Sequence, residues 1–282
     1  MAERLFLFVQ MEFPWELGPA DGRYLLRVGA DAEPERVVIL ETVGATPRRG
    51  RLGARRRPPV EPEPEPTTVP STRATVIDPV SVSAEHQARA WLAQLDAERE
   101  ARLAAVTINR LLFAHRIATA DPHVRELSPT QALTTRAGWG EGEQVAYGQW
   151  AHARELRFSE RRTRRSAALR PQERFAALLG AREAALLCEE LTLRAHLDLD
   201  QGRLAHAAIE LEQAYTAALL ELPAEDRLDL APRIAELEQL RPAVSAAARA
   251  APATPDEQAL RHALTRLEAA LRARTAGGLG RG

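Results

Sequence analysis

The chain contains no lysine. All 38 of its basic residues are arginine, and 39 aspartate and glutamate residues balance them to a net charge of −1. This balance excludes a basic field over the whole molecule, so any phosphate-binding surface has to be local. The planar guanidinium group of arginine suits phosphate and carboxylate recognition better than the point charge of lysine does. A GC-rich genome encodes basic residues mainly with arginine codons, and this codon bias explains the same composition without any ligand.

Cysteine is nearly absent as well, since Cys188 is the only one. A disulfide within the chain is therefore impossible, and the leucines and alanines around Cys188 predict a buried small hydrophobe rather than a nucleophile. The sequence has no run of about 18 apolar residues that would predict a membrane helix. Its N-terminus lacks the basic start and the long apolar core of a signal peptide. These absences predict a soluble protein of the reducing cytoplasm.

No complete catalytic motif is present. His196 and Asp200 are spaced by one helical turn, and Asp121 lies two residues before His123, but neither pair has the spacing of a metal-ligand motif. The glycine-rich stretch 138–142 lacks the Gly-Lys-Ser sequence of a phosphate loop. We therefore predict no catalytic residue, no cofactor and no metal site. The sequence leaves an enzymatic function uncertain and favours a non-enzymatic one.

The apolar residues of the first 80 positions follow the pattern of β-strands. Aromatic and branched side chains dominate four segments, residues 5–13, 23–28, 37–43 and 73–77. Turn-forming Pro, Gly and Asp residues between the first two segments predict a hairpin, and the four together predict a small antiparallel sheet over residues 3–78. The Arg/Pro/Glu-rich stretch 45–71 has too little apolar surface to be buried, and we expect a disordered insertion there.

From Ser83 onward the apolar residues recur at helical spacings, which predicts one long helix or two in tandem up to about Thr119. Glycines predict a connection at 121–150, and about five helices follow that break at prolines, Pro242 among them. The predicted fold class is α+β, with a small antiparallel β-sheet domain followed by a mainly α-helical bundle or repeat-like helical domain. The predicted divisions are 1–120 for the sheet and long helix, 121–150 for the connection, 151–276 for the helical domain and 277–282 for a disordered tail.

One stretch of the helical region, residues 185–220, resembles part of a known repeat. Gly202 interrupts its helical pattern, and three later positions match small, large and small packing positions: Ala207, Leu211 and Ala214. This pattern resembles the second half of a tetratricopeptide repeat, with Gly202 in the turn between two helices. Arg194 and Asp198 depart from the family, whose first helix has apolar and aromatic residues there, and no second copy follows. The resemblance implies a helical hairpin that binds a peptide or a partner protein in a groove.

Arginine is dense between Arg154 and Arg174. If this segment is helical, several of its arginines share one side, and Phe158 or Trp150 can stack a base. Glutamates within the segment dilute its charge and no RNA-binding fingerprint accompanies it, so a solvated helix face is the alternative interpretation. The predicted nucleic-acid-binding residues are Arg154, Arg157, Arg161, Arg162, Arg164 and Arg165.

Two functions are compatible with these patterns. The first is an intracellular adaptor or structural protein that acts through protein–protein contacts of its helical domain, around residues 171–274. The absence of a convergent catalytic set favours this function, although catalytic groups can converge in space from distant positions. The alternative is an RNA- or DNA-binding protein that uses the Arg154–Arg174 cluster. No membrane partner is expected.

Overall fold

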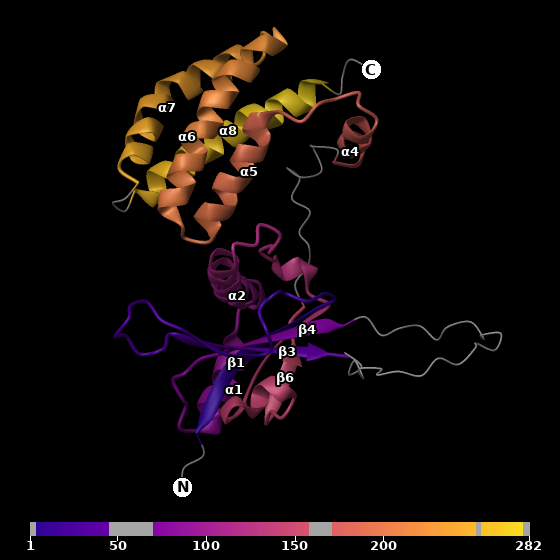
Figure 1. Ribbon diagram of the computed structural model, residues 1–282, viewed down its shortest axis with the longest axis vertical. Coiled ribbons are helices and arrows are strands. Elements are labelled where there is room, and N and C mark those ends of the chain that lie inside the picture. Colours follow the sequence, from indigo (N-terminus) through magenta and orange to yellow (C-terminus); the bar gives the residue numbers. More distant parts are fainter. Residues whose placement is uncertain (1–3, 45–69, 158–170, 252–254, 279–282) are drawn as a thin grey trace, which may run out of the picture. The chain divides into compact units, whose positions relative to one another are not determined.

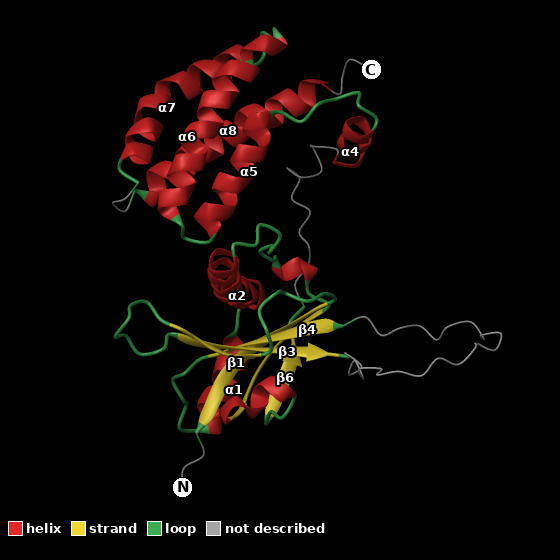
Figure 2. Cartoon of the chain, viewed as in Figure 1, coloured by secondary structure: helices red, strands yellow, loops and turns green. Residues whose placement is uncertain are grey.

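The computed structural model describes residues 4–44, 70–157, 171–251 and 255–278 (Figure 1). The chain divides into two compact units, Met1–Glu160 and Arg161–Gly282. The first unit contains the strands and the second is helical, so the predicted α+β fold class is confirmed (Figure 2). Among the described helices, none is long and apolar enough to cross a lipid bilayer.

The strands of the first unit form one antiparallel sheet. Its order is β2-β3-β4-β1-β5-β6. The strand bounds are β1 Leu5–Phe13, β2 Gly22–Leu26, β3 Arg36–Val43, β4 Ser71–Ile77, β5 Thr134–Glu141 and β6 His152–Glu155. The four strands expected before residue 80 are therefore present, and two more follow the long helical segment.

The predicted hairpin of residues 5–13 with 23–28 is wrong. Strand β1 pairs with β4 on one side, where Phe8 lies opposite Ile77, and with β5 on the other, where Phe8 lies opposite Gly138. Strand β2 pairs with β3 instead. Strand β1 is buried along most of its length at an inner position of the sheet, whereas β2, at the edge, alternates between exposed and partly buried residues.

Side chains of β1 alternate between two apolar layers, as the twofold period of a strand requires. Leu5, Val9 and Met11 pack in the larger core with α1 (Glu85–Gln94) and α2 (Ala97–Thr119). Phe8 belongs to a second cluster, with residues of β3 and of the 3-10 segment η2 (Gly142–Tyr147). The sheet is thus buried on both faces around β1, which explains the near-continuous apolar sequence of this strand.

The helical segment expected from Ser83 to about Thr119 is confirmed as two helices in tandem. Helix α1 ends before Leu95, and Asp96 is the N-cap residue of α2. The Asp96 carboxylate accepts a hydrogen bond from the main-chain N–H of Arg99 at 3.1 Å, which satisfies one of the free donors at the helix start.

The connection predicted at 121–150 is wrong for its second half, because β5 is an inner strand and the boundary between the units follows Glu160. A Cβ atom on Gly138 would lie 2.2 Å from the carbonyl oxygen of His152, and one on Gly140 would lie 2.8 Å from a methyl carbon of Val145. The glycines therefore allow β6 and η2 to approach the β5 backbone closely, rather than forming a loop.

The second unit is built from five described α-helices. They are α4 Pro171–Leu179, α5 Leu187–Asp200, α6 Leu204–Glu221, α7 Ala231–Arg249 and α8 Glu257–Gly278. Buried alanines and leucines of α5, α6, α7 and α8 form one core. The break predicted at Pro242 is wrong: α7 runs through this proline, and the buried Leu237 and Val244 anchor the turns on either side.

The end of α8 agrees with the helix stop predicted at residues 277 and 278. Two predicted disordered segments lie largely outside the described residues. These are the insertion at 45–71, of which residues 70 and 71 lead into and begin β4, and the tail at 277–282, of which the first two positions belong to α8.

Candidate functional site

Helices α5 and α6 form the antiparallel hairpin that the sequence predicts. Gly202 has a φ of +70° in the turn between them, a conformation that favours glycine. The three predicted packing positions Ala207, Leu211 and Ala214 are fully buried. The helical hairpin is therefore real, and its kinship to the tetratricopeptide repeat stays a prediction.

The two positions that depart from the repeat family make local ion pairs. The Arg194 Nε atom lies 2.9 Å from Glu190 Oε1 on the same helix, and an Arg203 Nη2 atom lies 2.7 Å from Asp198 Oδ1 across the turn. Both charged side chains therefore contact other polar groups of the hairpin.

The outward side of α5 carries exposed leucines. Leu193 is 68% exposed and Leu197 is 43% exposed, whereas Ala195 and Leu199 on the other side of the helix are buried. Because residues four apart lie on the same side of a helix, the two leucines form one apolar stripe. We call Leu193 and Leu197 the α5 stripe.

The N-terminal end of α5 is held by acidic side chains. The Glu221 carboxylate accepts hydrogen bonds from the main-chain N–H groups of Leu187 and Cys188 at 3.0 and 2.9 Å. Cys188 is fully buried, as predicted from its apolar neighbours. Burial, together with the hydrogen bond to Glu221, raises the pKa of the Cys188 thiol well above its usual range. The thiol is therefore protonated at neutral pH and unsuited to nucleophilic attack.

A buried arginine connects α8 to the segment before α5. Arg274 Nε lies 2.8 Å from Glu225, and its Nη1 atom lies 3.1 and 3.3 Å from Glu183 and Glu189. Arg174 on α4 pairs with the same two glutamates, at 3.2 Å to Glu183 and 2.6 Å to Glu189. We call these five residues the Arg274 network. Every member has an opposite charge within reach, so the network is suited to holding the helices together rather than to binding a ligand.

His196, considered as a ligand residue because of Asp200, is part of an ion-pair clasp between α5 and α8. Its Nε2 atom lies 3.3 Å from Asp200, and its Nδ1 atom lies 2.6 Å from Glu268. Hydrogen bonds to Asp200 and then to Glu268 raise the pKa of His196 to about 10. The imidazole is therefore a cation at neutral pH and not a metal ligand, which has to be neutral. Asp121, the other such candidate, accepts a hydrogen bond from the main-chain N–H of His123.

Of the predicted nucleic-acid-binding residues, the structure describes only Arg154 and Arg157. Arg154 lies in strand β6, so it is not part of a helical face, and Arg157 follows that strand and is exposed. The other four, Arg161, Arg162, Arg164 and Arg165, lie outside the described residues, as does Phe158. Trp150 packs against Phe8, with 5.7 Å between the ring centroids, and is partly buried.

Arg154 instead lines a cavity with other residues that suit nucleic acid. The cavity is about 480 Å³ in volume, and Arg89, Trp139 and His152 also line it. The ring centroids of Trp139 and His152 lie 4.9 Å apart, and His152 is exposed whereas Trp139 is buried. Because His152 and Arg154 are two residues apart in a strand, they share one face of the sheet. Arg89 already pairs with Glu85 at 2.8 Å.

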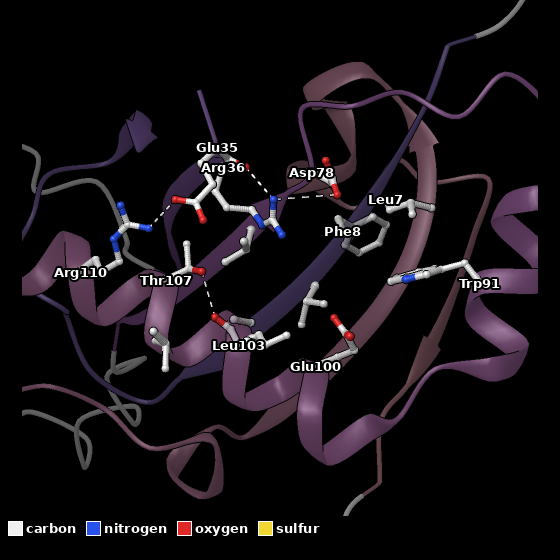
Figure 3. Close-up of a pocket in the computed structure, with 14 residues that line it drawn as sticks. Leu7, Phe8, Glu35, Arg36, Asp78, Trp91, Glu100, Leu103, Thr107 and Arg110 are labelled. Carbon is white, nitrogen blue, oxygen red and sulfur yellow. Dashed lines mark hydrogen bonds and ion pairs between the residues drawn. The ribbon is translucent and has the colours of Figure 1, made fainter. Parts of the chain in front are cut away.

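A second hollow of the first unit, which we call the cleft, lies between the sheet and the two helices. It is about 200 Å³ in volume, and its lining comes from β1, β3, β4, α1 and α2 with the residues just before β3 and just after β4 (Figure 3). Leu7, Val9 and Val76 provide apolar surface, Trp91 stands at one side, and the other lining groups include several charged side chains. The charged members of the lining are Glu35, Arg36, Asp78, Glu100 and Arg110.

Most of these charged groups are engaged with one another. An Arg110 Nη1 atom lies 2.7 Å from the Glu35 carboxylate. Arg36 donates a hydrogen bond to the main-chain oxygen of Glu35 at 2.7 Å, and its guanidinium lies 4.0 Å from Asp78. The Asp78 carboxylate also accepts a hydrogen bond from the main-chain N–H of Val80 at 3.0 Å.

Sequence reasoning missed the cleft. Trp91 lies in the helical segment expected from Ser83, and Asp78 is the last residue of the expected sheet, but neither position by itself indicates a hollow. The available signal was the placement of Asp78, at the end of a strand, and of Glu100, in the first turn of a helix. Ends of elements are where side chains from different elements meet, but which ends meet depends on the sheet order.

Comparisons of the chain with protein-family models, with curated proteins and with solved structures gave no match. Within the described part of the chain, no group of three or more His, Cys, Asp or Glu residues is placed to hold a metal ion. A function therefore has to be argued from the surfaces and cavities above.

Proposed function

We propose that this protein is an intracellular adaptor or structural protein that binds a protein partner through the outer side of its helical unit. The α5 stripe carries this proposal. A surface helix of a globular protein normally directs one apolar stripe into the core, and α5 has a second stripe of leucines that faces solvent. Two leucines at this spacing suit an amphipathic helix of the partner, which would pack its own apolar side against them.

The neighbouring helix supports the same proposal. Ile209 and Leu220 of α6 are also exposed, and they share one side of that helix because they are eleven residues, or about three turns, apart. The α5–α6 hairpin resembles part of a tetratricopeptide repeat, and repeats of that family bind peptides, which supports the same proposal. A cytoplasmic location is part of the proposal, because Cys188 is a buried free thiol and a reducing compartment preserves thiols.

The test is quantitative capture of partners by the full-length chain. The wild type would be compared with a double variant in which Leu193 and Leu197 are both replaced by Asp. A matched control is Leu228→Asp, because Leu228 is a highly exposed leucine in the same unit but outside the stripe. We expect a partner that the wild type and Leu228→Asp retain equally and that the double variant loses. Equal capture of that partner by the double variant, with circular dichroism showing all three proteins folded, would rule the proposal out.

The second candidate function is RNA or DNA binding by the Arg154–Arg174 cluster. The observation in its favour is that Arg154 shares a cavity with Arg89 and with the Trp139–His152 ring pair. Arginine can neutralise phosphates and an exposed ring can stack on a base. Among the described residues of this cavity, the exposed ring is that of His152.

Salt dependence distinguishes this candidate from the adaptor. Nucleic acid should bind the full-length chain with an affinity that falls steeply as salt rises, because bound phosphates release counterions. Replacing Arg161, Arg162, Arg164 and Arg165 by Gln should flatten that slope, and Arg154→Gln should flatten it by roughly one further unit. Arg102→Gln, an exposed arginine of α2 outside the cavity, is the control. Purified protein free of nucleic acid at low salt, with no gel shift on mixed RNA, would remove this candidate.

A further inference from the structure

The cleft of the first unit contains a carboxylate that no other described residue neutralises. Its lining has the carboxylates of Glu35, Asp78 and Glu100 and the guanidinium groups of Arg36 and Arg110, which is an excess of one negative charge. Arg110 is paired with Glu35, and Arg36 lies beside Asp78. Among the described residues, the Glu100 side chain makes no hydrogen bond or ion pair. The unbalanced charge of the cleft is therefore located at Glu100.

Glu100 and Trp91 come from different helices and face the same space. Glu100 lies in the first turn of α2, and Trp91 lies in α1. Figure 3 shows the Glu100 carboxylate and the Trp91 ring pointing toward the middle of the cleft, whose lining also includes Leu7. The cleft thus combines a free anion, an aromatic ring and an apolar floor.

We propose that the cleft binds a guanidinium group carried on a short alkyl stem. A planar guanidinium cation can stack on an indole ring and can also donate two parallel hydrogen bonds to one carboxylate. The alkyl stem would lie on Leu7, Val9 and Val76, as arginine stems commonly lie on apolar surface. Such a group occurs in free alkylguanidines and in the arginine side chain of a polypeptide. This inference concerns the first unit and does not depend on the function proposed for the helical unit.

The test is isothermal titration calorimetry of the full-length chain with four probes. Butylguanidine carries the proposed cation, and butylurea is its neutral and nearly isosteric analogue. Butyrate carries the opposite charge, and N-acetylarginine amide presents the cation as a polypeptide does. We expect butylguanidine to bind, with an affinity that falls as salt rises, and butylurea and butyrate not to bind. A tighter interaction with N-acetylarginine amide would identify a polypeptide as the source of the group, and a weaker one would identify a small molecule.

A variant pair tests the role of Glu100. Glu100→Gln keeps the shape of the side chain and removes its charge, and it should weaken butylguanidine binding by about tenfold or more, because a charge-assisted hydrogen bond is replaced by a neutral one. Glu98→Gln is the matched control, since Glu98 is exposed, is not among the cleft residues and also lies in the first turn of α2. The two variants lose the same favourable charge at a helix N-terminus. Their stability should therefore change equally.

Three results would overturn the proposal. These are no binding heat with butylguanidine at millimolar concentration, butylurea binding as tightly as butylguanidine, and equal affinities of Glu100→Gln and Glu98→Gln. Tryptophan fluorescence during thermal unfolding would show that each variant is folded at the temperature of the titration.

Discussion

Replacing Arg274 by methionine should destabilise the helical unit, because it removes the central cation of the Arg274 network. The Arg274 side chain is only 9% exposed and donates to Glu225, Glu183 and Glu189. Methionine is unbranched and can keep much of the apolar packing of the arginine stem. The substitution therefore tests the charge and its hydrogen bonds more than the volume.

The expected loss is smaller than that for an isolated buried pair. Removing one partner of a buried ion pair costs about 3–5 kcal/mol. Here Arg174 still pairs with Glu183 and Glu189, and the Glu225 side chain is 29% exposed, so water can replace part of its lost partner. We therefore expect a loss of about 2–3 kcal/mol in the free energy of unfolding, near the value of one or two charge-assisted hydrogen bonds.

The distribution of tryptophan allows this loss to be assigned to one unit of the full-length chain. All tryptophans precede residue 161: Trp15, Trp91, Trp139 and Trp150. Their fluorescence during urea unfolding reports on the first unit, while far-ultraviolet circular dichroism also reports on the helices of the second. Arg274→Met should move the dichroism transition to lower urea and leave the fluorescence transition where it is.

Two further variants make this prediction refutable. Arg241→Met is the control, because Arg241 is an exposed arginine of α7, and it should change stability by less than about 0.5 kcal/mol. The double variant Glu225→Gln with Arg274→Met should lose less free energy of unfolding than the two single variants lose together, because both substitutions remove the same interaction. If Arg274→Met is as stable as Arg241→Met, the network does not stabilise the unit and our reasoning fails.

Three other predictions concern single positions. The clasp of His196 with Glu268 and Asp200 should stabilise the helical unit fully below pH 6.5, the ordinary pKa of histidine, and lose this effect as the pH rises to about 10. Thermal unfolding of His196→Gln by circular dichroism should lack that loss between pH 6.5 and 10, and an identical pH profile would contradict the assignment. Gly138→Ala should lower the free energy of unfolding of the first unit by about 1–3 kcal/mol or more, because the added Cβ would meet the β6 backbone. The tryptophan fluorescence transition measures this loss, and an unchanged midpoint would contradict the close approach. Tyr215→Phe removes a buried hydrogen bond of 2.8 Å to a main-chain oxygen of α8. It should lower the free energy of unfolding, measured from the dichroism transition, by about 1 kcal/mol. An unchanged transition would indicate that the bond adds no net stability.

The sequence predicted several local features correctly. All four early strand segments, the two tandem helices, the turn at Gly202 and the burial of Cys188 are confirmed. These features depend on periodicity and on residues within one or two turns, which are visible in a single window of sequence. The second segment, β2, spans residues 22–26 rather than 23–28.

The predictions that failed all required knowledge of what packs against a residue. Glycines of 134–141 were interpreted as a connection, but they allow close approach of neighbouring backbone to an inner strand. Pro242 was expected to end a helix, but buried side chains on both sides keep α7 continuous. Arg154 was expected to share a helical face only if its segment is helical, and it lies in an edge strand instead. In each case tertiary contacts outweighed the local preference.

The sequence by itself determined the fold class and the packing positions of the α5–α6 hairpin, because hydrophobic periodicity encodes them locally. Only the tertiary structure decided the strand order, the Arg274 network and the cleft that brings Trp91 beside Glu100. These depend on residues that are distant in the chain, such as Leu7 and Glu100 or Glu183 and Arg274. Electrostatic attraction and packing act through space, and no spacing along the sequence records which distant groups the fold will place in contact.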